Sequence, residues 1–211
     1  MTEVDDYSGI DSAYDFFDDD RRLESQTVPP NMRHEQKDAK LLMINALKRE
    51  HLHEILREKP RPGVSLHIVG NGTFDFWTIV PAMAALLGGD CADLYGSTWT
   101  MNRGNVLSML ELFDRGEIKR LGILTGTYFK RRESAVYATL LQGIQARGQR
   151  FKCFENHAKI LLLSKPETGD FITVEGSANF TANPRVEQYV INNDRSLFDF
   201  HRAWMEAYLA E

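Results

Sequence analysis

Short apolar runs alternate with longer segments of helical periodicity between residues 64 and 155. The runs are typical of buried strands, and the segments between them place their apolar residues on one helical face. We expect strands at 64–69, 90–95, 120–124 and 151–155, and helices at 74–87, 104–115 and 133–147. Repeated strand–helix units predict a parallel sheet covered by helices.

The second half of the chain departs from this alternation. Two apolar runs, at 159–163 and 171–175, are separated only by a turn-forming segment at 165–169 that contains Pro and Gly, so they predict an antiparallel hairpin. An amphipathic helix is expected at 197–209. The expected fold is therefore α/β, with a mixed, mostly parallel sheet flanked by helices.

The N-terminal part follows other patterns. Residues 33–58 predict one helix, ended by Pro60 and Pro62. Residues 1–30 are acidic and close on two prolines, which predicts a flexible tail. Aromatic residues among the acidic ones leave a second interpretation open, in which the tail folds on a partner or on the rest of the chain. We expect residues 31–211 to form a single domain.

The charge is unevenly distributed. The net charge is −5, but residues 1–25 hold nine Asp/Glu and two Lys/Arg, which leaves 21 acidic and 23 basic residues in the rest of the chain. A weakly basic body thus carries an acidic tail. An excess of two positive charges is too small to assign a partner.

The composition of the chain is that of a globular protein and not of a membrane-spanning or secreted one. Hydrophobic residues make up 43% and charged residues 26% of the chain, as in ordinary globular proteins. No apolar run is long enough for a membrane span, and the acidic start lacks the apolar segment of a secretion signal, so we expect a cytoplasmic protein without a membrane partner. Cys91 and Cys153 have no partners at metal-ligand spacing, and we expect two buried thiols.

The most informative polar residues lie around the hairpin. His157 and Lys159 are two positions apart at the start of its first strand, so both side chains point to one face. Its second strand runs into Gly176-Ser177-Ala178-Asn179, a turn whose amide groups and hydroxyl suit an anion. Pairing of the two strands brings the turn near His157. Imidazole, ammonium, hydroxyl and amide groups together predict a phosphate site, although a plain turn and a solvated lysine are the simpler alternative.

This pattern resembles the HKD motif of the phospholipase D superfamily, through His157, Lys159, Gly176, Ser177 and Asn179. The resemblance implies a phospholipase D-like fold and a metal-independent phosphodiesterase that needs no cofactor. His157 would form a phosphohistidine, Lys159 and Asn179 would bind phosphate oxygens, and a downstream acidic residue, Glu187, would orient His157. Small members with one motif are typically nucleases.

The chain departs from the family pattern in one place. The motif's Asp, five residues after the lysine, is replaced by Ser164, and Asp170 is one candidate to take its role. The alternative to a nuclease is therefore a catalytically decayed module that binds nucleic acid or protein. A phospholipid-acting enzyme ranks last, because no membrane-binding amphipathic helix stands out.

Loops after the second and third strands supply candidate substrate contacts. Aromatic and basic side chains there suit stacking on bases and pairing with phosphates, which makes nucleic acid, and DNA in particular, the expected partner. A solvated basic loop with packed aromatics is the competing interpretation. The candidate residues are Trp99, Tyr128, Lys130, Arg131 and Arg132.

The number of motifs predicts the oligomeric state. In the chemistry that the resemblance implies, one histidine attacks while a second protonates the leaving group. The chain has one His-x-Lys with a following Gly-Ser-x-Asn and no internal repeat. We therefore expect a homodimer in which the two copies of His157 face each other across the two-fold axis.

Overall fold

The computed structural model describes residues 51–181 and 185–211. The expected acidic tail, and most of the helix expected at 33–58, lie outside these residues; residues 51–55, which the structure describes, are helical. The proposed boundary between tail and domain stays a prediction.

Secondary structure overlaps every strand and helix expected between residues 64 and 209. The strands are β1 (Ser65–Gly70), β2 (Cys91–Thr98), β3 (Ile118–Gly126), β4 (Arg150–Phe154), β5 (Ile160–Lys165), β6 (Asp170–Gly176) and β7 (Glu187–Asn193). The helices are α3 (Ile79–Leu86), α4 (Arg103–Asp114), α5 (Thr127–Arg132), α6 (Ser134–Ala146) and α7 (Arg195–Ala210), with 3₁₀ turns η3 (Phe76–Thr78) and η4 (Pro166–Thr168).

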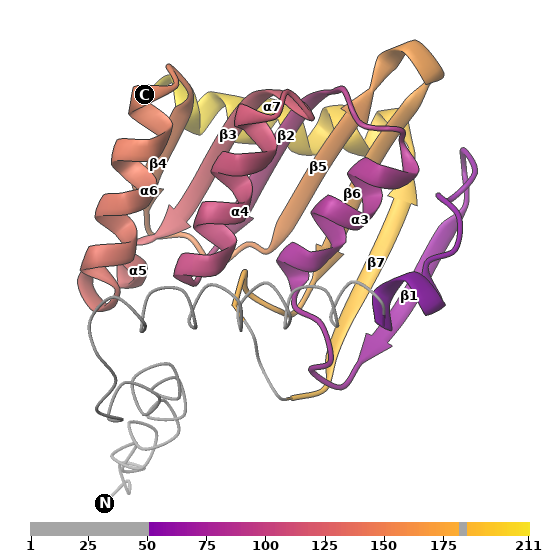
Figure 1. Ribbon diagram of the computed structural model, residues 1–211, viewed down its shortest axis with the longest axis horizontal. Helices are drawn as coiled ribbons and strands as arrows, with labels where there is room; N and C mark the ends of the chain where they lie inside the picture. Colours follow the sequence, from indigo (N-terminus) through magenta and orange to yellow (C-terminus); the bar gives the residue numbers. More distant parts are fainter. Residues whose placement is uncertain (1–50, 182–184) are drawn as a thin grey trace, which may run out of the picture. The chain divides into compact units, whose positions relative to one another are not determined.

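All seven strands form one sheet in the order β1-β7-β6-β5-β2-β3-β4 (Figure 1). The sheet is mixed, as expected, but it is not mostly parallel. Only β2–β3 and β3–β4 pair in parallel, while the other four pairings are antiparallel. The reason is that β5 and β7 run against the other five strands and insert between β1 and β2, so most neighbours are antiparallel although most strands point the same way.

The sequence pattern missed β7. Its apolar centre, Tyr189 to Ile191, is short and lies between polar residues, which hid the strand. In the fold β7 pairs with β1 and β6 at once, and Tyr189 and Ile191 are buried. Hydrogen bonding to a strand on each side stabilises β7, and the local sequence pattern gives no sign of this stabilisation.

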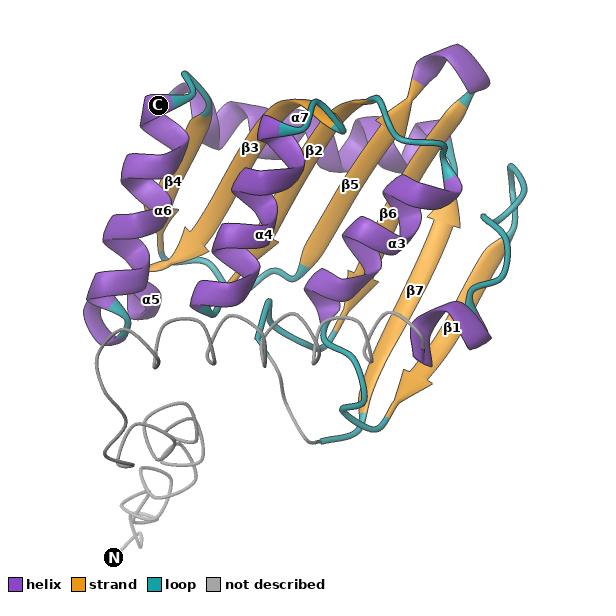
Figure 2. Ribbon diagram, in the orientation of Figure 1, coloured by secondary structure: helices purple, strands orange, loops and turns teal. Residues whose placement is uncertain are grey.

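Helices cover both faces of the sheet (Figure 2). On one face α3, α4 and α6 enclose the larger core, and on the other α7 packs Phe198 and Met205 against Tyr95, Leu124 and Leu162. Because β5 is flanked by both layers, its residues 160–164 are all buried. This explains why its sequence reads as a continuous apolar run.

One edge of the sheet gathers the loops that matter for function. Here β1, β2, β3, β4 and β6 end and β5 and β7 begin. We call it the site edge. Two polar side chains cap helices that follow it: Asp75 Oδ1 accepts from Thr78 N at 3.0 Å, and Asn102 Oδ1 accepts from Asn105 N at 2.8 Å.

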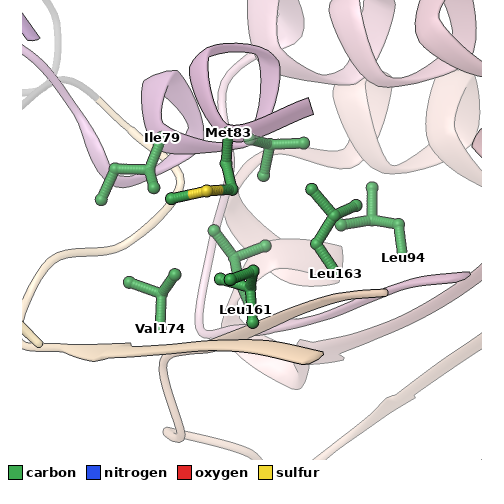
Figure 3. Close-up of a pocket in the computed structure, with 8 residues that line it drawn as sticks. Ile79, Met83, Leu94, Leu161, Leu163 and Val174 are labelled. Atoms are coloured by element: carbon green, nitrogen blue, oxygen red, sulfur yellow. The ribbon is translucent and has the colours of Figure 1, made fainter. Parts of the chain in front are cut away.

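The larger core contains a small apolar gap between α3 and the sheet. Its volume is about 10 Å³, and Ile79, Met83, Leu94, Leu161, Leu163 and Val174 are among the residues that line it (Figure 3). A gap of this size without polar groups is a packing defect and not a ligand site. Among the described residues, no helix is long and apolar enough to cross a membrane.

Candidate functional site

The predicted site residues lie in loops of the site edge. His157 and Lys159 precede β5, Ser177 and Asn179 follow β6, and Glu187 opens β7. Trp99 follows β2, and Tyr128 lies in α5, directly after β3. The sheet order places the β5 loop between the β6 loop and the β2 loop. Sheet topology thus collects residues that are up to 88 positions apart in the sequence.

His157 and Lys159 are in direct contact. Lys159 Nζ lies 3.1 Å from His157 Nδ1 and donates to the His157 carbonyl oxygen at 2.9 Å. An ammonium group only donates hydrogen bonds, so Nδ1 accepts and the neutral ring carries its proton on Nε2. The lysine therefore favours the neutral form of the imidazole, and its ammonium group occupies the lone pair of Nδ1.

Both groups of this pair have shifted pKa values. Partial loss of water, and secondarily the charge of Lys159, lower the pKa of His157 below its ordinary value near 6.5, although the residue as a whole is exposed. Burial also lowers the pKa of Lys159, while the negative charge of Glu187 opposes that shift. A neutral imidazole beside a half-buried ammonium is suited to nucleophilic attack on an anionic ester.

Ser177 links the β6 turn to β7. Its hydroxyl donates to Glu187 Oε2 and accepts from Gln188 N at 3.1 Å, while Ser177 N donates to Gln188 O at 3.1 Å. The role predicted for Glu187, orientation of the His157 ring, is a different contact and stays a prediction. What the carboxylate does in this structure is to fix Ser177 and to place a negative charge near Lys159.

Asn156 holds the loop that carries the histidine, and the sequence pattern did not single it out. Asn156 Oδ1 accepts from Ala158 N at 3.1 Å, and its Nδ2 donates to Ser97 Oγ at 3.0 Å. Ser97 Oγ also donates to Ala158 O at 3.1 Å. An Asn two positions before a backbone amide is a known turn signal, so this contact was accessible from the sequence.

The segment that carries Asn179 is held by the end of β2 through the backbone of Phe180. Asn179 Oδ1 lies 3.5 Å from Thr98 Oγ1, which also accepts from Phe180 N at 3.1 Å. Phe180 itself is fully buried against Phe76 and Trp77. The Gly-Ser-x-Asn turn is therefore anchored from below by an aromatic residue that follows it.

An aromatic pair borders the histidine. The rings of Trp99 and Tyr128 stack with centroids 4.1 Å apart, and the Trp99 ring lies 5.4 Å from the His157 ring. Gly126, the last residue of β3, makes room for this arrangement, since a Cβ there would lie 2.5 Å from Trp99 Cδ1 and 2.8 Å from Asn156 O. Any side chain at 126 would displace both loops.

The predicted basic residues lie on α5, at the same edge. The Arg132 guanidinium lies over the Tyr128 ring at 6.0 Å, whereas Lys130 lies over Tyr137 at 5.8 Å, and Arg131 is exposed. Two further exposed arginines at the site edge were not singled out by the sequence: Arg103 begins α4, after β2, and Arg185 precedes β7. Each is isolated from other basic residues in the sequence, so only the fold groups them.

The site contains no evident metal-ligand set. In the part of the chain that the structure describes, no three His, Cys, Asp or Glu side chains cluster as metal ligands would. Cys91 is buried as expected, and Cys153 is only half-buried; its thiol donates to Gly126 O at 3.4 Å.

Sequence comparison finds no match to a protein-family model and no matching curated protein. Comparison with solved structures finds Nuc, a phospholipase D family member from Salmonella typhimurium, at 16% identity and a TM-score of 0.48, over 69% of this chain and 94% of Nuc. It also finds polyphosphate kinase from Porphyromonas gingivalis, at 13% identity and a TM-score of 0.50, over 67% of this chain and 25% of the kinase. This chain has a phospholipase D-like fold.

A third structure, the archaeal chromatin protein TrmBL2, matches at 10% identity and a TM-score of 0.45, over 84% of this chain and 65% of TrmBL2. Likeness at these identities concerns the fold alone. The chain spans a quarter of the length of the kinase.

Ser164 stands where the resembled motif has Asp, and the structure shows what surrounds it. Ser164 is fully buried and donates to Asp93 Oδ2 at 3.0 Å. Asp93 lies on the neighbouring strand β2 and accepts two hydrogen bonds from Arg120, at 2.6 and 2.9 Å. Asp170 instead bonds Lys59 and Asn193. A buried carboxylate is thus present beside position 164, but β2 supplies it.

This arrangement predicts that restoring the motif residue is harmful. Ser164→Asp places a second buried carboxylate against Asp93, and the like charges lower the free energy of unfolding by about 3 kcal/mol. Urea denaturation at neutral pH measures the change. Ser134→Asp, which adds the same charge at an exposed helix start, leaves stability near that of the wild type. Adding Asp93→Ser to Ser164→Asp recovers part of the loss. An unchanged midpoint for Ser164→Asp alone contradicts the interpretation.

The contact between Lys159 and His157 predicts a direction of titration. The pKa of His157 lies below 6.5 in the wild type and rises in Lys159→Met, because a neighbouring positive charge is removed; desolvation, the larger cause, remains. Titration of the His157 ring by NMR measures both values. Lys119→Met, at the opposite end of β3, serves as control. A pKa that falls or does not move in Lys159→Met argues against the contact.

Proposed function

We propose that this protein is a metal-independent phosphodiesterase, and specifically a nuclease, in which His157 is the nucleophile. The observation that carries the proposal is the neutral imidazole held 3.1 Å from the Lys159 ammonium, beside the Gly-Ser-x-Asn turn. A phosphate oxygen that enters the site competes for the ammonium. When Lys159 moves to that oxygen, the ring nitrogen is uncovered next to the phosphorus atom.

The reaction then proceeds in two steps. The ring lone pair forms an N–P bond, the P–O bond to the leaving group breaks, and the departing oxygen takes a proton from a second imidazole, which enters this step as the protonated imidazolium beside the anionic phosphate and leaves it neutral. That imidazole next removes a proton from water, which attacks phosphorus and breaks the N–P bond. Lys159, Asn179 and the turn amides stabilise the charge on the phosphate oxygens, so the proposal needs no cofactor.

The described residues contain no second His-x-Lys. His67, on β1, precedes Val69 at the corresponding position. The proposal therefore includes a homodimer in which His157 of each copy serves the other as acid and base.

A nucleic acid substrate, with DNA as the expected form, is favoured by the chemistry next to the nucleophile. Stacked Trp99 and Tyr128 suit contact with bases, and Lys130, Arg131 and Arg132 suit phosphates. The alternative, a decayed module that only binds nucleic acid or protein, rests on the loss of the motif's Asp at Ser164. Asp93 weakens this alternative, because a carboxylate is retained beside that position.

We expect His157→Ala to abolish hydrolysis of single-stranded DNA, because no other group provides the N–P bond, while the thermal melt stays nearly unchanged. His67→Ala, which removes an exposed histidine of β1, retains full activity. Wild-type activity persists in excess EDTA, since the charge stabilisation comes from side chains and amides. Full activity of His157→Ala would falsify the assignment, and strict dependence on Mg²⁺ would point to another site.

The dimer is tested by mixing. Wild-type protein unfolded and refolded with an excess of His157→Ala forms mixed dimers, and their activity per wild-type chain falls sharply because the second imidazole is missing. Mixing with His67→Ala is the control and leaves activity unchanged. Light scattering at micromolar concentration measures the mass directly. A strict monomer that retains activity contradicts this part of the proposal.

A further inference from the structure

Five exposed basic side chains gather on the site edge without carboxylate partners. Nine other Lys and Arg side chains of the described residues form ion pairs with Asp or Glu. No ion pair within the described part of the chain involves any of the five. The three neighbouring cations of α5 repel one another, and a polyanion relieves that repulsion. The five are Arg103, Lys130, Arg131, Arg132 and Arg185.

These groups lie on both sides of the nucleophile. His157 precedes β5, which is the middle strand of the series β7-β6-β5-β2-β3. Arg185 precedes β7, two strands away on one side, and the three α5 residues follow β3, two strands away on the other. At about 4.8 Å between strands, the basic groups flank His157 by roughly 10 Å each way.

Acidic groups on the same edge do not cancel this charge. Glu187 bonds Ser177, and Glu155 accepts from Thr127 Oγ1 at 2.6 Å. Glu133 lies between α5 and α6. Asp75 caps η3 after β1, and Glu175, next to the end of β6, lies 3.3 Å from His201 Nε2. With Lys159 included, six cations face these five carboxylates.

We infer that a nucleic acid chain lies across the strand ends and continues past His157 in both directions, so that internal phosphodiester bonds are cut. This inference rests on the proposed function and extends it. A site for chain ends would hold cations on one side of the nucleophile only. The span of about 19 Å from β7 to β3 accommodates at most about six phosphates at a stacked spacing of 3.4 Å.

The first test is binding to a covalently closed circle of single-stranded DNA, with the His157→Ala protein to prevent cleavage. Arg185→Ala and Arg131→Ala are added separately, one for each side of the site. Each lowers affinity several-fold and reduces the slope of log K against log salt by about 0.7, because each removes one phosphate contact. Lys119→Ala, at the opposite end of β3, removes the same charge and leaves the slope unchanged. The inference is overturned if the circle does not bind, or if only one side of the site contributes.

The second test is cleavage by the wild-type protein. The circle is first converted to a full-length linear strand and then to fragments, at a rate similar to that of a linear oligonucleotide of the same sequence. Degradation of the linear strand with an intact circle overturns the inference while the proposed function stands. Failure to cut either substrate contradicts the proposed function instead, and the binding result still decides whether the chain crosses the site.

Discussion

The antiparallel insertion of β5 between β2 and β6 determines the rest of the site. Backbone pairing with β2 and β6 fixes the register of β5, and buried side chains on both of its faces oppose a slip by one residue. Because β5 runs against both neighbours, its first residues meet their last ones. His157 and Lys159 are thereby placed between the Trp99 loop and the Ser177 turn. The end of β2 holds the His157 loop through Ser97 and the segment after the Ser177 turn through Thr98.

The same register explains the electrostatic state of the site. Lys159 is close enough to His157 to share a hydrogen bond, so protonation of the ring would bring two positive charges together. Half-burial of the lysine strengthens this effect, since less water screens the pair. The resting site is thus a coupled pair in which the lysine carries the charge and the histidine carries the lone pair. Glu187, fixed through Ser177, moderates the cost of keeping Lys159 charged.

Much of this could be predicted from the sequence, for identifiable reasons. Alternating apolar runs located β1 to β6, and the His-x-Lys and Gly-Ser-x-Asn spacing located the centre of the site, because these are local signals. The strand β7 escaped, since its stability comes from two neighbours and not from its own composition. The sheet was expected to be mostly parallel because a helical connection indicates that two successive strands run in the same direction. It does not indicate which strands lie next to each other in the sheet. Arg103 and Arg185 became visible only when the strand ends were brought together, whereas the turn formed by Asn156 has a local signal in the sequence, which our prediction did not use.

The pairing of Ser164 with Asp93 has a consequence for substitutions at these two positions. The buried acid lies on β2, where Arg120 neutralises it, and β5 contributes only a small hydroxyl donor. The effect of an acidic residue at position 164 then depends on whether position 93 is also acidic, because the two side chains are in contact. The two residues are therefore coupled through space, across adjacent strands, although 71 positions separate them in the chain.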